Sequence, residues 1–271
     1  MKNGRKKQEQ IHLCAHGEDY GNWMPVSMLQ LVGGLAVLAA VLSLLSLAVF
    51  HITALGVVFV IAALLLLALL LWITWIRRQY AFGSGGMMEQ VHQVVLSHLD
   101  FDGQGQLLDV GCGSGALSIR AALIWRAAQV VGIDYWGSAY GYGQAMCEKN
   151  AASEGVAARC RFQHGDANKL DFPDESFNAV VSNYVYHNIT GADKRNLLRE
   201  TLRVLKKGGV FALNDDMKPR MYGDMEEFAK KLRKMGYREV RIIDTAQEAF
   251  GSHRRATLMM LGNSRMIVGQ K

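Results

Sequence analysis

The sequence has no lysine, arginine, aspartate or glutamate between residues 20 and 76, and His51 is the only histidine in that stretch. A water-facing protein surface needs polar and charged side chains, so this part of the chain is not an ordinary soluble domain. The remaining residues, 77–271, have the mixed composition and the length of a single globular core. The 271-residue chain therefore divides into an apolar part and a globular part.

Cysteine is also scarce. The four cysteines form no C-x-x-C pair and lie far apart, at Cys14, Cys112, Cys147 and Cys160. This pattern argues against a disulfide framework. His12, Cys14 and His16 alternate in the N-terminal tail, but a zinc site needs a fourth ligand, so we expect a solvated tail and no metal site. The net charge of +6 includes no run of five basic residues, and we expect no nucleic-acid partner.

Two apolar runs, at about 28–50 and 56–76, are each long enough to cross ~30 Å of hydrocarbon as a helix. The turn between them is short, and a pair of helices satisfies every backbone group inside a bilayer. The first run is not a cleaved signal peptide, because about 25 mostly polar residues precede it and a second run follows. A helical pair buried in a soluble protein is the alternative, but neither run has a polar face.

Basic residues flank the two runs at their outer ends, as Lys2, Arg5, Lys6, Lys7, Arg77 and Arg78, and the connecting turn has none. The positive-inside rule then places both ends in the cytoplasm. Trp23, Trp72 and Trp75 lie near the same ends, where indole rings favour the membrane interface. We therefore predict a cytoplasmic tail over 1–25, two transmembrane helices within 26–77, a linker over 78–86 and a cytoplasmic domain over 87–271.

Apolar and amphipathic segments alternate through the globular part, beginning with an expected helix at 87–99. Short buried runs predict seven strands, at 107–110, 129–133, 158–163, 179–182, 209–213, 238–243 and 265–269. Helices are expected between them, at 116–128, 143–153, 192–205 and 225–235. This alternation is typical of an α/β fold, here a Rossmann-like, mostly parallel seven-stranded sheet with helices on both faces. Residues 256–262 fit a helix, a strand or part of a lid.

A glycine-rich turn follows the first expected strand and opens a helix. It reads Gly111-Cys112-Gly113-Ser114-Gly115. Glycine lets the backbone approach a ligand closely, and a helix N-terminus favours negative groups. In such a fold a ligand binds at the carboxyl ends of the strands. We therefore expect this loop to hold a cofactor.

Two cofactors fit the loop. The spacing G-x-G-x-x-A that begins at Gly111, with Asp134 about 20 residues further on, satisfies a relaxed dinucleotide fingerprint in which the acid binds a ribose. Three further features favour a cofactor that ends in an ammonium group. Asp109 stands two residues before the first glycine, Gly115 completes G-x-G-x-G, and Asp166 follows the third expected strand.

These motifs, with Gly165-Asp166-Ala167 and the run at 170–177, resemble the class I S-adenosylmethionine-dependent methyltransferases. The likeness extends over about 87–271. The sequence Phe-Pro-Asp at 172–174 and the segment 204–209 resemble the methyltransferase-11 branch, which includes quinone and sterol C-methyltransferases. One departure is Asn178, where the branch usually has aspartate. Asparagine can keep a turn-type hydrogen bond at this position.

The resemblance implies S-adenosylmethionine as the cofactor and a role for each site residue. The loop would hold the methionine end through Asp109, Gly111, Cys112, Gly113 and Gly115. Asp134 would bind both ribose hydroxyls, and Tyr135 would pack on the adenine. Asp166 would accept from the adenine amino group, Ala167 would donate its backbone N–H, and Asn183 would offer its carbonyl to the ammonium.

Methyl transfer is an in-line displacement from an activated sulfonium, so the protein mainly aligns donor and acceptor in a dry pocket. A base is needed only where the acceptor must lose a proton. His187, just after the fourth expected strand, could be that base or could cap the next helix. That helix carries basic residues that are expected to form a solvated face, namely Lys194, Arg195, Arg199, Arg203, Lys206 and Lys207.

The sequence thus predicts a membrane-anchored methyltransferase that acts on a small-molecule, lipid-like or quinone-like acceptor, since the anchor would confine enzyme and acceptor to one surface. Two alternatives remain open. One is a nicotinamide-dependent oxidoreductase that uses the same glycine loop. The other is a non-catalytic membrane protein that binds S-adenosylmethionine.

Overall fold

The computed structural model describes residues 13, 18–83, 86–137 and 141–271. The chain forms two compact units, one of residues 22–81 and the other of residues 82–271 together with the segment before residue 22. Several residues singled out in the N-terminal tail lie outside the described residues: Lys2, Arg5, Lys6, Lys7, His12, Cys14 and His16.

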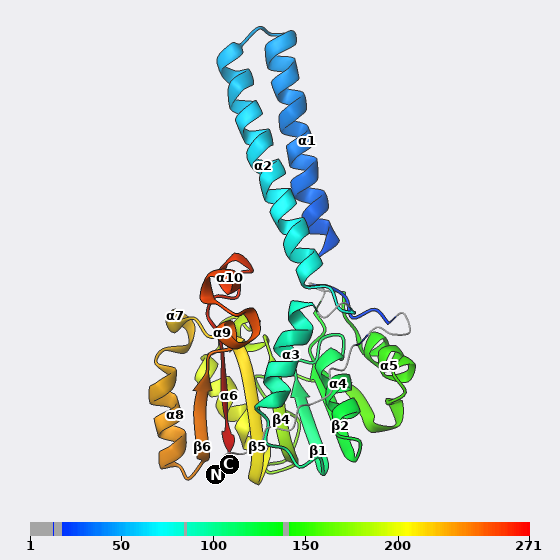
Figure 1. Ribbon diagram of the computed structural model, residues 1–271, viewed down its shortest axis with the longest axis vertical. Coiled ribbons are helices and arrows are strands. Elements are labelled where there is room, and N and C mark those ends of the chain that lie inside the picture. The colour runs from blue at the N-terminus through cyan, green and yellow to red at the C-terminus, as the bar shows by residue number, and fades with distance from the viewer. Residues whose placement is uncertain (1–12, 14–17, 84–85, 138–140) are drawn as a thin grey trace. The chain divides into compact units, whose positions relative to one another are not determined.

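The unit of residues 22–81 is a pair of long helices, α1 (Val26–Ala48) and α2 (Thr53–Gln79), which lie side by side in Figure 1. Each expected apolar run is thus one continuous helix. The Ser43 hydroxyl donates to the Gly56 carbonyl oxygen over 3.0 Å. A Cβ atom added to Gly56 would lie 2.4 Å from the Leu47 side chain, so glycine permits the close approach of the two helices.

Both helices are long and apolar enough to cross a membrane. In their most apolar windows only 22% of α1 and 6% of α2 is buried within the structure. Exposed aliphatic side chains surround them, including Leu31, Leu44, Leu64 and Leu65. The central helix of a soluble protein would instead be mostly buried, so this exposure argues against that alternative.

The outer ends of α1 and α2 are joined by polar contacts. The Asn22 side-chain amide donates to the Arg77 carbonyl oxygen over 2.8 Å, and the Arg77 guanidinium donates to the Met24 carbonyl oxygen. The rings of Trp23 and Tyr80 lie 5.8 Å apart. The chain therefore enters and leaves the helical pair at the same end.

The other unit contains a seven-stranded sheet in the order β3-β2-β1-β4-β5-β7-β6. Its strands are β1 (Gly105–Val110), β2 (Ala128–Asp134), β3 (Cys160–His164), β4 (Phe177–Asn183), β5 (Leu205–Asp216), β6 (Arg238–Ile243) and β7 (Ser264–Gln270). The first five pair in parallel, and β7 runs antiparallel between β5 and β6. The predicted mostly parallel, seven-stranded sheet is confirmed.

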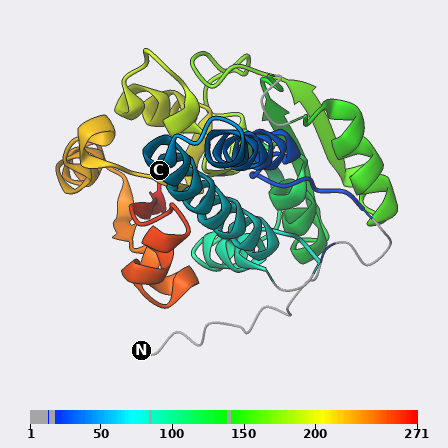
Figure 2. The same cartoon turned by 90° about the horizontal axis from the view of Figure 1, so that it is seen from above.

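Helices cover both faces of this sheet. They are α3 (Met87–Ser97), α4 (Ala116–Ile124), α5 (Gln144–Ser153), α6 (Lys194–Arg203), α7 (Pro219–Tyr222), α8 (Met225–Lys234), α9 (Thr245–Phe250) and α10 (His253–Leu258), with short 3₁₀ turns η1 (Ala157–Arg159) and η2 (Tyr186–Asn188). Figure 2 shows α3 and α6 on opposite sides of the sheet. One core joins α6 and α8 to the sheet, with Leu198, Phe211, Phe228 and Ile267 fully or almost fully buried. The order β3-β2-β1-β4 reverses direction next to β1, which is where ligands bind in open α/β sheets.

Several predicted boundaries shift for physical reasons. α6 begins at Lys194 because the Asp193 carboxylate accepts from the Arg195 and Asn196 backbone N–H groups and caps the helix. α4 ends at Ile124, and the Arg159 guanidinium donates to its Ala122 carbonyl oxygen over 2.6 Å. The segment 256–262, for which three structures were considered, is largely α10 and the turn that follows it.

Candidate active site

The glycine loop leaves the carboxyl end of β1 and leads directly into α4. The backbone N–H groups of Gly111 and Cys112 donate to the Ile133 carbonyl oxygen over 2.7 and 2.9 Å, which fixes the loop against β2. Gly111 has φ +75°, and a Cβ atom there would lie 2.1 Å from the Val185 side chain. A Cβ atom on Gly113 would meet nothing closer than the Tyr142 ring at 3.5 Å. Gly111 is therefore required for packing, whereas Gly113 leaves space beside the loop.

Asp134 ends β2, and its carboxylate faces the same loop. It accepts from the Gly113 backbone N–H over 2.9 Å and from the Trp136 backbone N–H over 2.7 Å. The Trp136 indole N–H in turn donates to the Gly113 carbonyl oxygen over 2.8 Å. Each carboxylate oxygen keeps a second lone pair, so Asp134 can still accept from a pair of neighbouring hydroxyls.

Asp109 lies beneath the loop and is 1% exposed. Burial raises the pKa of this carboxyl from 3.8 to about 7; the nearby Asp134 also raises it, and a 2.6 Å hydrogen bond from Ser118 Oγ opposes the shift. A neighbouring cation would stabilise the ionised form of such a buried carboxyl. This environment fits the predicted contact with an ammonium group, which stays a prediction.

Residues for the adenine are expected after β2 and β3, which pair in register so that Asp134 stands beside His164. Tyr135 is 66% exposed and its ring lies 5.0 Å from the His164 ring. Asp166 accepts from the Asn168 backbone and side chain, both over 2.8 Å, and Ala167 is buried. Because the strands are parallel, these groups lie at the same carboxyl ends of the strands as the glycine loop. The Tyr135 ring is accessible there.

Asn183 ends β4. Its neighbour Ser182 is in register with Val110, so Asn183, the last residue of β4, lies level with Gly111. Its side-chain oxygen accepts from the Asn214 amide over 2.8 Å. Tyr184, the next residue, has φ +58°, a strained conformation for a side chain of this size. Trp136, after β2, has φ +45°. Strain of this kind often accompanies functional loops.

His187 is held by a fully buried acid that sequence reasoning missed. Its Nδ1 lies 2.5 Å from Asp215 Oδ1, and its backbone N–H donates to Asp215 Oδ2 over 3.1 Å. The Tyr222 hydroxyl also donates to Oδ2, over 2.8 Å. Burial, followed by the nearby Asp215, raises the pKa of Tyr222 well above its usual value, so Tyr222 remains a donor.

An ionised carboxylate only accepts hydrogen bonds, so Asp215 favours the tautomer with its proton on Nδ1 of His187. The Nε2 lone pair is then available to accept a proton, on a side chain that is 26% exposed. The signal in the sequence was the pair Asp215-Asp216 at the end of an apolar strand. Pattern reasoning ended that strand at residue 213, before the acids.

Asn178 does not behave as the sequence indicated. Its side-chain oxygen accepts from the Gln106 backbone N–H over 3.1 Å and from Lys206 Nζ over 3.0 Å. The prediction of a turn-type hydrogen bond is therefore wrong. The Asn178 side chain instead links β4 to β1 and β5. In the described part of the chain no three His, Cys, Asp or Glu side chains cluster to hold a metal ion.

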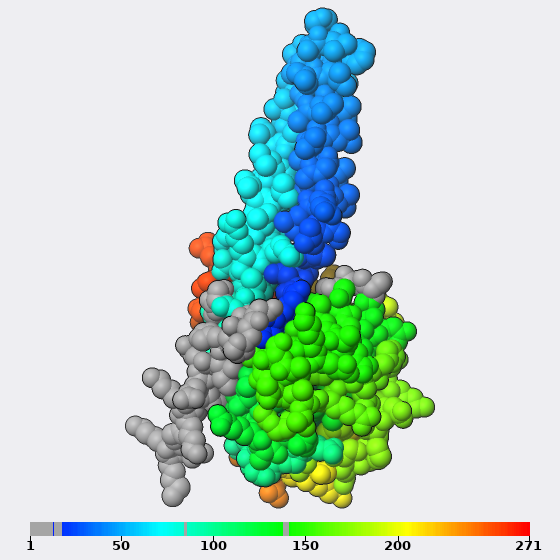
Figure 3. Space-filling model, turned by 90° about the vertical axis from the view of Figure 1, so that its right-hand side faces the viewer, coloured from blue at the N-terminus to red at the C-terminus, as the bar shows by residue number. Residues whose placement is uncertain are grey.

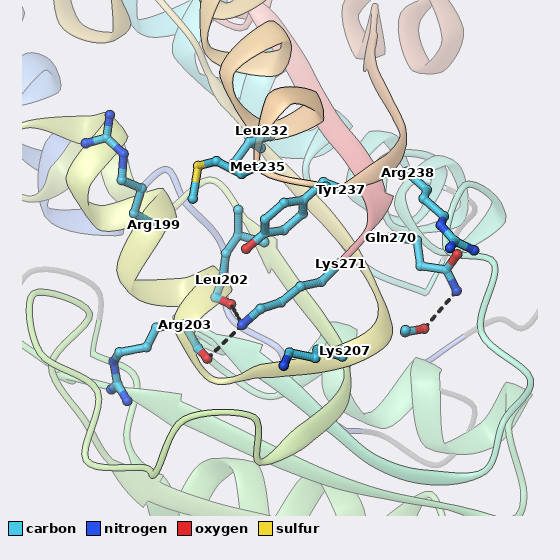
Figure 4. A pocket seen from close by; sticks show the side chains of 12 residues that line it. Arg199, Leu202, Arg203, Lys207, Leu232, Met235, Tyr237, Arg238, Gln270 and Lys271 are labelled. Atoms are coloured by element: carbon cyan, nitrogen blue, oxygen red, sulfur yellow. Dashed lines mark hydrogen bonds between the residues drawn. The ribbon is translucent and has the colours of Figure 1, made fainter.

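A cavity of about 680 Å³ lies at the other end of the strands, where Lys207 and Arg238 stand near the starts of β5 and β6 (Figure 4). Two of its cationic side chains have partners within the protein. Arg203 pairs with Asp174 and Glu200, and Lys271 Nζ donates to the Leu202, Arg203 and Leu205 carbonyl oxygens. This cavity is separate from the glycine loop, none of whose residues lines it.

Comparison with known sequences identifies the same region. Residues 108–213 match a family model described as a methyltransferase domain. A 27-O-demethylrifamycin SV methyltransferase from Amycolatopsis mediterranei is 30% identical over 141 residues, 51% of this chain and 48% of that protein. A ubiquinone/menaquinone biosynthesis C-methyltransferase from Pseudomonas fluorescens is 34% identical over 115 residues, 42% of this chain and 43% of that protein. A sterol 24-C-methyltransferase from Aspergillus fumigatus is 30% identical over 128 residues, 47% of this chain and 32% of that protein.

The chain therefore spans less than half the length of these curated relatives. Among solved structures, the cyclase SpnF has a TM-score of 0.54 at 20% identity, covering 70% of this chain and 83% of that one. A geranyl diphosphate methyltransferase in complex with GPP and sinefungin has a TM-score of 0.51 at 16% identity, covering 69% and 83%. These likenesses show the fold, and because one of the two is a cyclase the fold alone does not establish the reaction. The sequence comparisons add what the fold cannot: residues 108–213 match a methyltransferase domain, and the relatives that the chain resembles there are methyltransferases.

Proposed function

We propose that this protein transfers a methyl group from S-adenosylmethionine to a small hydrophobic acceptor that resides in a membrane, with His187 as general base. The observation that carries the proposal is the His187–Asp215 pair, which stands two residues after Val185, the side chain that packs on Gly111 of the glycine loop. The loop and Asp134 account for the cofactor. The oriented imidazole accounts for an acceptor that must lose a proton, such as a hydroxyl or an activated carbon acid.

Each residue then has a definite task. S-adenosylmethionine, when bound, supplies a methyl group on a positively charged sulfur, whose bond electrons return to that sulfur on transfer. Asp134 would accept from the ribose hydroxyls, and Asp109 would face the ammonium group. His187 Nε2 takes the acceptor proton, and Asp215 stabilises the imidazolium that forms. Tyr222, by donating to Asp215, fixes the carboxylate in place.

The membrane part of the proposal rests on α1 and α2. Both are long, apolar and largely exposed, and their outer ends are joined through Asn22 and Arg77. We propose that they span the bilayer as a hairpin with both ends in the cytoplasm, because basic flanking residues favour the cytoplasmic side. The sterol and quinone methyltransferases among the relatives act on lipid-like compounds by name, which fits an acceptor of this kind.

The cofactor assignment is tested on the full chain in lipid nanodiscs by calorimetric titration with S-adenosylmethionine and S-adenosylhomocysteine. We expect micromolar affinity for both, lost in Asp134→Ala. Binding of NAD and not of S-adenosylhomocysteine would instead favour the oxidoreductase. A folded protein that binds neither would remove the basis of the proposal.

The catalytic assignment is tested with radiolabelled methyl transfer into a membrane lipid extract. Asp215→Asn should lower kcat about 10²-fold while the affinity for S-adenosylhomocysteine stays within about twofold, because a base contributes to the chemical step only. The activity of wild type on acceptors embedded in nanodiscs should exceed that on water-soluble analogues. Equal rates on both would contradict a membrane-resident acceptor, and an active Asp215→Asn variant would contradict the base.

A further inference from the structure

The segment just before the helical pair, residues 18–21, packs on the globular domain. Figures 1 and 3 show this blue segment beside the green helix α5. Tyr20 is 2% exposed, its hydroxyl donates to Glu154 over 3.2 Å, and its ring lies 5.4 Å from that of Phe82. Earlier in the chain, Leu13 is 1% exposed. A solvent-exposed tail would not bury aromatic and aliphatic side chains in this way.

One side chain joins this segment to the cofactor loop. The Asn150 amide nitrogen, on α5, donates both to the Asp19 carbonyl oxygen over 2.9 Å and to the Ser114 carbonyl oxygen over 3.2 Å. Asn150 is 1% exposed. Ser114 lies between the last two glycines of the loop. Both protons of a single amide group are thus used to connect the tail with the loop.

A second contact acts on the same loop. Gly21 has φ +67°, and a Cβ atom there would lie 2.4 Å from the Tyr142 ring. The other edge of that ring faces Gly113, where an added Cβ atom would be 3.5 Å away. Tyr142 therefore stands between the tail and the loop. Any movement of residues 18–21 changes the packing on the ring and the hydrogen bonding of Ser114 together.

We propose that residues 18–21 form a strap that orders the cofactor loop, and that Asn150 is the positioning residue through which the strap acts. The inference rests on the proposed function, because its consequence is a change in affinity for S-adenosylmethionine. Strap docking and cofactor binding share the same loop, so each favours the other to the same extent. Loss of the strap should weaken cofactor binding about tenfold, within the usual range of such couplings.

The test uses the full chain in nanodiscs and the probe S-adenosylhomocysteine. Asn150→Asp keeps the size of the side chain but removes the donor, and Gly21→Val places a branched side chain against Tyr142. Each should raise the Kd about tenfold and raise KM for S-adenosylmethionine more than it changes kcat. Two controls should leave Kd within twofold. Lys149→Ala changes an exposed neighbour on α5, and Gly251→Val imposes the same backbone strain at φ +73° where no atom lies within 4 Å.

A direct measurement follows the strap itself. A glutamate-specific protease cuts after Glu18, which is 8% exposed, only when the strap lifts. Saturating S-adenosylhomocysteine should slow this cut about tenfold in wild type and much less in Asn150→Asp. Wild-type binding with unchanged Kd in both variants and ligand-independent cleavage would overturn the strap and leave the proposed function standing. No binding by folded wild-type protein would overturn the proposed function itself.

Discussion

At the residue scale, the environment of Asp109 carries a cost to the stability of the fold. The carboxyl is buried beneath the glycine loop, and its pKa is raised to about 7 chiefly by that burial. The folded state therefore binds a proton at Asp109 more tightly than the unfolded chain does. This contribution to stability is complete below about pH 4 and is lost as the pH rises to about 7.

Asp109→Asn should separate the two roles. Asparagine stays neutral, so above pH 7 we expect the free energy of unfolding to exceed that of wild type by about 2–4 kcal/mol, with the difference vanishing towards pH 4. Affinity for S-adenosylmethionine should fall, because the carboxylate that we propose to face the ammonium group is gone. Thermal unfolding between pH 5 and 8 and calorimetry at pH 8 measure both effects. Equal stability of the two proteins at every pH would contradict the buried charge.

The loop glycines differ in a way that mutation can resolve. Gly111→Ala adds a Cβ atom 2.1 Å from Val185 at φ +75°, and strain with overpacking should cost about 2–5 kcal/mol. Gly113→Ala carries similar backbone strain but its Cβ atom only reaches ordinary contact with the Tyr142 ring at 3.5 Å, so it should cost about 1 kcal/mol and mainly weaken cofactor binding. Denaturant unfolding and calorimetry distinguish them. A Gly111→Ala variant as stable as Gly113→Ala would show that Val185 moves aside.

Residues contiguous in the chain were predictable, and residues assembled by folding were not. Gly111, Asp134 and Asp166 could be placed because each lies at or just after the carboxyl end of a strand, and parallel strands have these ends on the same side of the sheet. Asp215 could not be assigned to His187, because their contact depends on the pairing of β4 with β5 and on the extension of β5 to Asp216. That extension is held by β7, whose antiparallel pairing no local pattern reveals.

Among elements, α6 departs most from its sequence pattern. Its basic residues were expected to form a solvated face, yet Lys194 is buried and donates to the Ile189 carbonyl oxygen. Arg203 holds a loop: its guanidinium donates to the Leu170 and Phe172 carbonyl oxygens, both over 2.9 Å. It also pairs with Glu200 over 2.8 Å. A helical charge pattern shows spacing, but it does not show which loop will pack against the helix.

Removing this arginine should destabilise the domain. Arg203→Ala leaves two loop carbonyls without the guanidinium donor and the Glu200 carboxylate without its ion-pair partner, which should cost about 1–3 kcal/mol and lower Tm by several degrees. Arg203→Lys should recover only part of the loss, because an ammonium cannot reproduce the planar fork. Exposed Lys207→Ala is the matched control, with Tm within about 1 °C expected. A Tm for Arg203→Ala as high as that of this control would show that the contacts contribute nothing.

At the scale of the whole molecule, connectivity constrains topology. Residues 18–21 and residues 82–271 belong to one compact unit, and the helical pair is inserted between them in the sequence. If α1 and α2 cross a bilayer, both outer ends must lie on the side of the globular domain. The distribution of basic residues favours the same arrangement on different grounds, since it concerns the flanks and not the contacts.

Labelling with a membrane-impermeant maleimide tests this topology in sealed vesicles, on a background without the four native cysteines. Ile52→Cys, in the exposed turn between α1 and α2, should react from the extracytoplasmic side only. Asn3→Cys in the tail and Arg238→Cys in the globular domain should each be labelled at least fivefold faster in inverted vesicles than in right-side-out vesicles. Reaction of the tail and the domain from opposite sides would contradict the hairpin. It would also contradict the strap, because residues 18–21 could not then reach α5.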